Sequence, residues 1–189
     1  MLREDTPTHT RAVTEQADSR WYAVKTYVNR EFKLKKYLDE HDIENYIATR
    51  YIESLVNGRK KRKLVPAVSC LVFVKTGKAR LLELQTELGR QNIYIYYDHQ
   101  TKSPQVIPDS QINAFILITS THDNGLEYVD PLEISHKVGD RVRVTGGLFA
   151  GAEGRLVRIK NRKRLVVTIE GVAAVATAYI PNCYIEKIA

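Results

Sequence analysis

The sequence predicts an α+β domain followed by a small β-domain, with a linker between them. In residues 20–120, stretches rich in aromatic and β-branched residues alternate with stretches of helical spacing, which is typical of helices packed on a mostly antiparallel sheet. In residues 137–189 the strand-like runs are short and glycines are frequent, which predicts a small β-barrel. Residues 121–136 have weak periodicity and contain an Asn-Gly pair and a proline, so we expect a linker there.

Regular structure is expected to begin at Trp21. Residues 1–19 are polar and rich in Thr, Asp, Glu and Arg, and we expect them to form a flexible tail. Residues 21–27 are aromatic and β-branched, which predicts a strand. Asn29 is a suitable N-cap for a helix that runs to about His41, because apolar residues then recur at i, i+3, i+4 and i+7.

A hairpin and a buried strand are expected next. The pattern of residues 46–56 predicts a half-exposed strand and residues 59–65 its partner strand, and the Asn57-Gly58 pair between them favours a type I′ turn. Residues 70–74 are continuously apolar, which is typical of a strand buried on both faces. Cys70 is expected to be a small buried residue at its start.

The remaining elements follow from the same signals. We expect a helix over 79–88 that Gly89 ends, a strand over 92–97, a short strand at 106–107 and a helix that Pro108-Asp109 begins and that runs to about Ser120. In the C-terminal part, short strands are expected near 142–144, 156–159, 165–169, 176–180 and 184–188.

The charge of the chain suggests a polyanionic partner. It has 29 Lys and Arg against 22 Asp and Glu, a net charge of +7, and residues 137–189 carry +6 of it. The two cysteines and five histidines have no metal-ligand spacing, and no P-loop or nucleophile elbow is present, so we expect no metal, no other cofactor and no enzymatic activity. Neither a signal peptide nor a membrane span is evident, which predicts a cytoplasmic protein without a membrane partner.

Residues 138–157 read VGDRVRVTGGLFAGAEGRLV and resemble a KOW motif. The residues that give it its turns and strand starts are Gly139, Asp140, Gly147, Gly151 and Gly154. The motif occurs in NusG-type factors, in several ribosomal proteins and in related RNA-associated proteins, and the resemblance implies an SH3-like barrel.

The N-terminal part is similar to the N-terminal domain of the NusG family. It has Trp21-Tyr22 at the start of a strand, an adjacent helix, a basic hairpin, an apolar strand and the segment PQVIPD at 104–109 before a last helix. Together the two resemblances cover about residues 20–189. RfaH-like members can hold the KOW domain as a helical hairpin, but the glycines and β-branched runs here favour strands.

Two departures from the family pattern indicate a specialised paralog. NusG proteins usually have a Phe-Pro-Gly-Tyr-like segment before the buried strand, whereas residues 65–70 read VPAVSC. Housekeeping members carry a Phe in a KOW-domain loop that contacts a ribosomal protein, whereas residues 170–175 read EGVAAV. The chain therefore looks more like RfaH or the antiterminators of capsular-polysaccharide operons.

The resemblance also implies a docking surface for the clamp helices of RNA polymerase. Its apolar candidates are Tyr22, Ile112 and Phe115, and plain core packing is the alternative for each. Lys33 and Lys36 share a helix face that the resemblance places near the non-template DNA strand, although an ordinary charged helix face would have the same pattern.

The hairpin carries five consecutive cations after its turn, namely Arg59, Lys60, Lys61, Arg62 and Lys63. Alternation along a strand puts the first, third and fifth on one face. We expect phosphate contact without base reading, and a solvated hairpin tip is the alternative. A second basic stretch at 158–164 either touches RNA or only increases solubility.

The function implied by the resemblance is transcription elongation and antitermination. Such a factor binds RNA polymerase, suppresses pausing or termination at specific operons such as those for polysaccharide biosynthesis, and contacts a further protein partner through its KOW domain. Two alternatives remain open, namely a ribosome- or RNA-associated KOW protein and a housekeeping NusG that acts with Rho.

Overall fold

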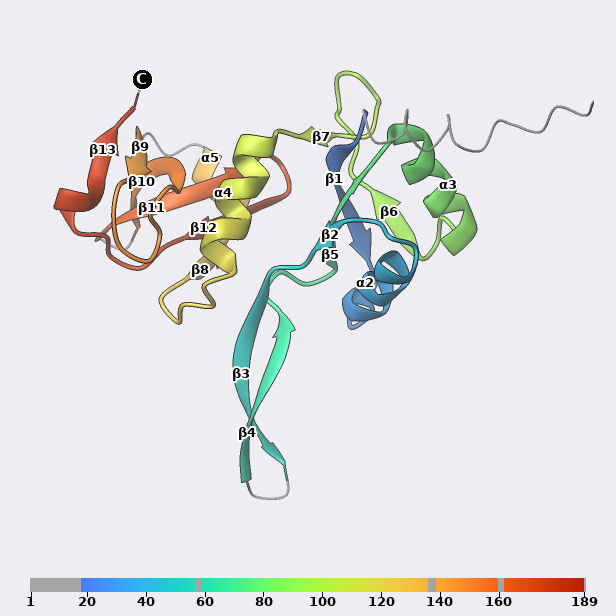
Figure 1. Cartoon of the computed structure of the whole chain (residues 1–189), viewed down its shortest axis with the longest axis horizontal. Coiled ribbons are helices and arrows are strands. Elements are labelled where there is room, and N and C mark those ends of the chain that lie inside the picture. Colours follow the sequence, from blue (N-terminus) through green and yellow to red (C-terminus); the bar gives the residue numbers. More distant parts are fainter. Residues whose placement is uncertain (1–17, 57–58, 136–138, 160–161, 189) are drawn as a thin grey trace, which may run out of the picture.

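The computed structural model describes residues 18–56, 59–135, 139–159 and 162–188 of the chain. Almost all of the expected tail, and the expected turn at 57–58, lie outside these residues. The described chain forms two larger sheets and a two-stranded hairpin that projects away from both (Figure 1).

The N-terminal sheet is antiparallel, as the sequence predicts. Its strand order is β2-β5-β1-β6, and β7 pairs with β1 on the edge that β6 also uses. The strands are β1 (Arg20–Thr26), β2 (Asn45–Tyr46), β5 (Leu71–Thr76), β6 (Ile93–Ile95) and β7 (Val106–Ile107). The continuously apolar run of β5 is buried, which confirms the prediction of a strand buried on both faces.

Alternation along β1 directs its side chains into two different cores. Tyr22 and Val24 pack with the helices α2 (Glu31–Glu40) and α3 (Lys78–Leu88). Trp21 and Ala23 belong to the core on the opposite face of the sheet. The predicted end of α3 is confirmed, because Gly89 follows its last residue with a φ of 86°.

The predicted N-cap of the first helix is wrong. Asn29 has a φ of 63°, and the N-cap is Arg30, which makes no side-chain capping bond. Glu31, in the first turn, is only 2% exposed, and its Oε1 accepts the backbone N–H of Cys70 at 2.7 Å. This bond ties α2 to the segment entering β5, where Cys70 is partly exposed and precedes the strand with a φ of 65°.

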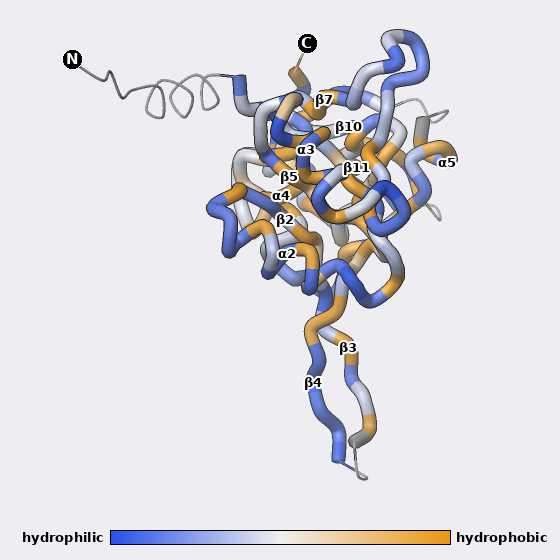
Figure 2. Tube along the Cα trace, turned by 90° about the vertical axis from the view of Figure 1, so that its right-hand side faces the viewer, coloured by the Kyte–Doolittle hydropathy of each residue, from blue (hydrophilic) through white to orange (hydrophobic). Residues whose placement is uncertain are grey.

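The hairpin forms a sheet of its own from β3 (Thr49–Val56) and β4 (Arg59–Pro66). The register pairs Val56 with Arg59 and continues to the pair Thr49 with Pro66. The type I′ turn predicted at residues 57–58 lies outside the described residues and stays a prediction. Figure 2 shows the hairpin extending from the body, with β4 hydrophilic over most of its length.

The C-terminal sheet has six antiparallel strands in the order β13-β9-β10-β11-β12-β8. Five of them are β9 (Asp140–Val144), β10 (Glu153–Ile159), β11 (Arg162–Ile169), β12 (Ala173–Ala176) and β13 (Ile185–Lys187). They confirm the prediction of strands instead of a helical hairpin. The strand expected at 176–180 is wrong except for its first residue, because the strand there is β12 at Ala173–Ala176, whose small buried residues pair with β11, and residues 177–180 are not in a strand. The pairing runs in one line from β13 to β8, and closure into a barrel stays a prediction.

The segment expected as a linker, residues 121–136, carries two short elements. β8 (Glu127–Val129) pairs with β12, and α5 (Pro131–Ser135) packs Ile134 against Val157 and Val166. A strand of three residues and a helix of five are too short to show periodicity in the sequence. Part of the expected linker is thus a strand of the C-terminal sheet.

The helix α4 (Asp109–Thr119) lies between the two larger sheets (Figure 1). Its fully buried residues Ile112, Phe115 and Ile118 share one core with Phe73 of the N-terminal sheet and with strands of the C-terminal sheet. Burying three side chains of this size contributes roughly 1.5–3 kcal/mol each, so α4 is the main apolar connection between the two parts.

Candidate nucleic-acid interface

The register of the hairpin decides which of its cations share a face. Residues directly opposite each other in an antiparallel pair point to the same side. Lys61 lies opposite Ser54 and Lys63 lies opposite Ile52, while Arg59 is at the end of the same row. Arg50 lies two positions before Ile52 on β3 and therefore belongs to the same row. These four exposed residues, Arg50, Arg59, Lys61 and Lys63, form what we call the cationic face.

No carboxylate lies on the cationic face among the described residues, and none of its four cations forms an ion pair there. Its positive charge is therefore not neutralised within the described part of the chain. Arg50 was not among the predicted site residues. Only the strand register identifies it. Arg50 lies opposite Val65, which is on the same face of β4 as Lys61 but four residues further along, outside the basic run.

The other face of the hairpin is different in composition. Lys60 pairs with Glu53, with Nζ 3.3 Å from Oε2. The guanidinium carbon of Arg62 lies 4.5 Å from the centroid of the Tyr51 ring, a cation–π geometry. Leu55 is 75% exposed on this face. The structure thus divides the five predicted cations into three without acidic partners and two with partners on the hairpin.

Lys33 and Lys36 lie on the exposed surface of α2, in agreement with the predicted helix. Lys36 forms an ion pair with Glu40, at 3.7 Å. Lys33 has no ion pair among the described residues, and it lines a groove together with Arg30 and Tyr37. The two lysines therefore differ, since only Lys33 has a free charge to offer to a ligand.

The three predicted docking residues are buried in this arrangement of the chain. Tyr22 is 3% exposed and faces α2 and α3, on the side of the sheet away from α4. Its assignment to the same surface as Ile112 and Phe115 is wrong, because alternation along β1 puts Trp21 on that side. Ile112 and Phe115 are both 0% exposed.

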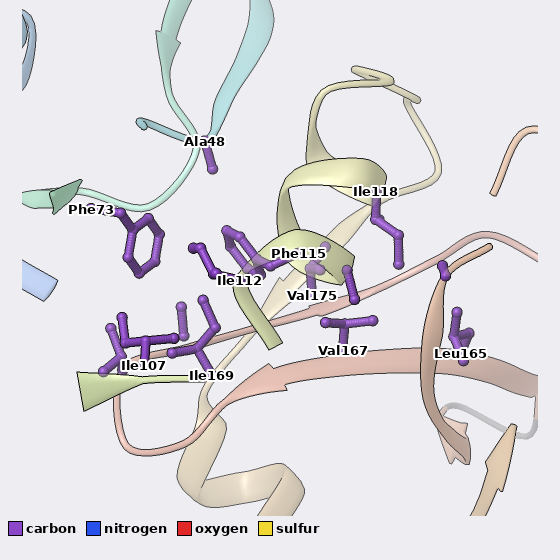
Figure 3. Packing of buried hydrophobic residues seen from close by; sticks show 14 of the residues in the cluster. Ala48, Phe73, Ile107, Ile112, Phe115, Ile118, Leu165, Val167, Ile169 and Val175 are labelled. Carbon is purple, nitrogen blue, oxygen red and sulfur yellow. The ribbon is translucent and has the colours of Figure 1, made fainter. Parts of the chain in front are cut away.

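Figure 3 shows how Ile112 and Phe115 are covered. They lie with Phe73 on one side and with Val167, Ile169 and Val175 on the other. The rings of Phe73 and Phe115 meet edge to face, with 5.5 Å between centroids. The C-terminal sheet therefore covers the helix face that the sequence assigned to docking.

Polar contacts surround this apolar interface. The hydroxyls of Tyr46 and Thr119 are 2.7 Å apart, and the Thr49 hydroxyl lies 2.9 Å from Nε2 of His122. Gln105 Nε2 donates to the backbone oxygen of Glu170 at 2.8 Å. The first two bonds tie β2 and β3 to α4 and to the residue that soon follows it, and the third joins the segment before β7 to the residue that follows β11.

The glycines and the aspartate of the segment that resembles a KOW motif have a structural role in the C-terminal sheet. A Cβ added at Gly139 would lie 2.5 Å from the backbone oxygen of Leu156, and one at Gly154 would lie 2.5 Å from that of Val166. Both positions therefore need glycine for close strand approach. Gly147 and Gly151 have φ values of 80° and 88°, and Asp140 pairs with Lys187 at 2.9 Å.

Within the described part of the chain, no group of three or more His, Cys, Asp and Glu side chains is placed to hold a metal ion. A search of the described helices finds none with the length and apolar character needed to cross a membrane.

Comparison with known proteins identifies one family. The model of the NusG family, described as transcription termination factor nusG, matches residues 19–116, which is more than half of the chain. Among solved structures, the chain is similar to one described as "Domain interaction in Thermotoga maritima NusG". The sequence identity is 20% and the TM-score is 0.41, over 92% of this chain and 99% of the other. No curated protein matches the sequence.

Proposed function

The chain belongs to the NusG family of transcription factors, and we propose from this premise that it binds elongating RNA polymerase and suppresses pausing or termination. One observation carries the proposal. The region that matches the family, residues 19–116, is also the region that bears the projecting hairpin with its cationic face. Factors of this family bind RNA polymerase, and a cationic face next to the bound enzyme is suited to contact its nucleic acids.

The proposed docking surface for the clamp helices of the polymerase is the face of α4 that carries Ile112 and Phe115. Both residues are covered by the C-terminal sheet, so docking through them requires that sheet to move away. Residues 20–120 and 137–189 then act as two domains, and the separated state is the one that the polymerase binds. Binding energy shifts the population toward that state, and no chemical step is needed.

The proposed nucleic-acid contact is made through phosphates by the cationic face and by Lys33. The non-template DNA strand is the segment that we expect at Lys33 and Lys36. Contacts of this kind set affinity and salt dependence, while they do not distinguish sequences.

We further propose that the chain is a specialised, RfaH-like antiterminator for particular operons, such as those for polysaccharide biosynthesis. The segment at 170–175, which contains the loop between β11 and β12 and the start of β12, supports this idea, because it reads EGVAAV and offers no aromatic side chain to a ribosomal protein. The C-terminal sheet, as a KOW domain, would contact a different protein partner.

Transcription with purified RNA polymerase on a template with a pause site and a Rho-dependent terminator tests this function. Added protein is expected to shorten the pause and to increase read-through of the terminator. The variant with Arg59, Lys61 and Lys63 changed to Gln serves as the comparison, and it should act only at higher concentration. More termination in the presence of Rho would instead identify a housekeeping factor.

A further inference from the structure

A hollow lies at the boundary between α4 and the C-terminal sheet, where α4 packs against β10 and β11 (Figure 1). Ser110 and Gln111 of α4 line it from one side, and residues of β9, β10 and β11 line it from the other. Its volume is about 330 Å³, at the lower end of the range of roughly 300–1,000 Å³ that is usual for small-molecule sites. A ligand in this hollow therefore touches both parts of the chain.

Two arginines from neighbouring strands stand on the sheet side of the hollow. Arg141 of β9 lies directly opposite Arg155 of β10 in the strand register, and both are exposed. Neither forms an ion pair or a side-chain hydrogen bond among the described residues. Like charges directly opposite each other on one face of a sheet destabilise it. An anion between the two guanidinium groups would offset this repulsion.

The only carboxylate among the described lining residues is already engaged. Glu153 lies opposite Arg143, and its Oε1 accepts hydrogen bonds from Nη2 of Arg143 at 2.6 Å and from Nε at 2.8 Å. Because Arg143 does not line the hollow, Glu153 is neutralised from outside it. Arg141 and Arg155 keep their charge, and a concave surface with an excess of positive charge attracts an anion.

Uncharged donors accompany the two arginines. The hydroxyls of Ser110 and Thr168 form no side-chain hydrogen bond within the described part of the chain. Gln111 uses its Oε1, which accepts the backbone N–H of Glu170 at 3.4 Å, so its amide N–H groups are left for a ligand. Guanidinium, hydroxyl and amide donors around one hollow suit a group with several anionic oxygens.

We propose that this hollow binds a small phosphorylated molecule, and that the bound phosphate holds the C-terminal sheet against α4. A phosphate monoester carries nearly two negative charges at neutral pH and has three strong acceptor oxygens, which match the two free arginines and the donors from α4. A single carboxylate has one charge and two oxygens, and it leaves part of this donor set unused. Such a ligand adds a regulatory step to the proposed function, on which this consequence rests, because it favours the arrangement in which the docking face is covered.

Isothermal titration calorimetry of the full chain with pyrophosphate, in a phosphate-free buffer and without polymerase, tests the proposal. We expect binding that weakens at least tenfold when Arg141 and Arg155 are changed together to Gln, because charge-assisted hydrogen bonds to phosphate are lost. Pyrophosphate should also slow hydrogen exchange in α4 and β11 of the wild type, since the ligand joins both elements.

The matched control changes Arg158 and Lys163 together to Gln. These two cations also lie directly opposite each other, on β10 and β11, but they do not line the hollow. The affinity of this control for pyrophosphate should equal that of the wild type, and circular dichroism shows whether each variant is folded.

A folded Arg141→Gln, Arg155→Gln protein that binds pyrophosphate like the wild type contradicts the proposal. So does binding that leaves hydrogen exchange in α4 and β11 unchanged. Equal affinity for succinate would show that the hollow takes carboxylates, and tighter binding of rU12 through the same two arginines would indicate an RNA backbone. Because no polymerase is present, failure here leaves the proposed polymerase binding to its own test.

Discussion

Phe115 shows at the level of one residue how the two parts of the molecule are joined. Its ring meets Phe73 of the N-terminal sheet edge to face, while the same side chain lies in a core with strands of the C-terminal sheet. The apolar spacing of Ile112 and Phe115 on α4 is compatible with either docking or core packing. The structure gives Phe115 a core position in the closed arrangement.

Replacement of Phe115 by Ala should lower the free energy of unfolding by about 3–5 kcal/mol, because a large buried ring leaves a cavity that its neighbours fill only in part. Urea titration followed by circular dichroism measures the change. Leu117→Ala is the matched control on the same helix, since Leu117 is 37% exposed and should change stability much less. Equal effects of both substitutions would show that Phe115 is not packed as described.

Tyr128 carries a buried hydroxyl without a hydrogen-bond partner among the described residues. Burial raises the pKa of Tyr128 to about 12. Above pH 10 the unfolded chain loses this proton while the folded chain keeps it, so the folded state binds more protons and its stability falls as pH rises. The stability is complete below pH 10 and is lost progressively toward pH 12.

The change Tyr128→Phe should therefore leave stability at pH 7 unchanged or raise it by up to about 1 kcal/mol, because an unpaired buried polar group is removed. It should also reduce the loss of stability between pH 10 and 12, by roughly 1 kcal/mol after allowance for the ring's partial exposure. Thermal unfolding across this pH range measures both effects. The control Tyr179→Phe, at an exposed ring, should show neither effect. If stability falls between pH 10 and 12 as much in Tyr128→Phe as in the wild type, the Tyr128 hydroxyl is not the group responsible.

At the level of elements, the hairpin is the part of the candidate site that the sequence predicted best. The two paired strands and the face shared by Arg59, Lys61 and Lys63 follow from local pattern, although the strand expected over 46–56 is divided into β2 and β3. Arg50 could not be assigned, because its membership of the cationic face depends on cross-strand register. The partners of Lys60 and Arg62 also depend on the opposite strand.

Elements whose position depends on distant contacts were predicted less well. β8 consists of three residues and is a strand because β12 offers it a free edge. Asn29 has the chemistry of an N-cap but lies in a left-handed turn, and the helix starts where Glu31 can reach the Cys70 amide. The burial of Ile112 and Phe115 needs the C-terminal sheet, which no local pattern of α4 could indicate.

Changing Arg59, Lys61 and Lys63 together to Gln should flatten the salt dependence of binding to a polymerase–DNA scaffold. Each single-strand phosphate contact contributes about −0.7 to the slope of log affinity against log salt, so three contacts account for roughly −2. The fold should persist, because exposed substitutions change stability by only about 0.5 kcal/mol each.

The double change Lys60→Gln, Arg62→Gln is the matched control for this experiment. It removes two cations from the same strand, but from the face where Glu53 and Tyr51 already engage them. The slope of log affinity against log salt should therefore change less for this double variant than for the triple variant. The change should be smaller even when it is divided by the number of charges removed. Equal slopes for the wild type and the folded triple variant would mean that the cationic face touches no phosphate.

For the whole molecule, the closed arrangement covers the proposed docking face. The C-terminal sheet covers Ile112 and Phe115, and two hydrogen bonds help to hold it there. Gln105 Nε2 donates to the backbone oxygen of Glu170 at 2.8 Å, and the backbone N–H of Glu170 donates to Gln111 Oε1 at 3.4 Å. If only the separated state binds the polymerase, the apparent affinity is reduced by the fraction of molecules in that state.

Changing Gln105 and Gln111 to Ala should consequently tighten polymerase binding, by roughly fivefold for each kcal/mol of interface stability removed. Both side chains lie at the edge of the apolar interface, so the two domains should stay folded. Faster hydrogen exchange in β11 and α4 would report the loosened interface. Faster hydrogen exchange with an unchanged affinity for the polymerase would show that docking does not depend on separation of the sheets.

Co-purification of the tagged full chain with its partners, from cells that contain it, tests the central claim most directly. The account predicts that RNA polymerase subunits are recovered in stoichiometric amounts at moderate salt, and that recovery increases with the Gln105→Ala, Gln111→Ala variant. Recovery of ribosomal RNA and ribosomal proteins in place of polymerase would contradict the account and would identify a ribosome-associated KOW protein.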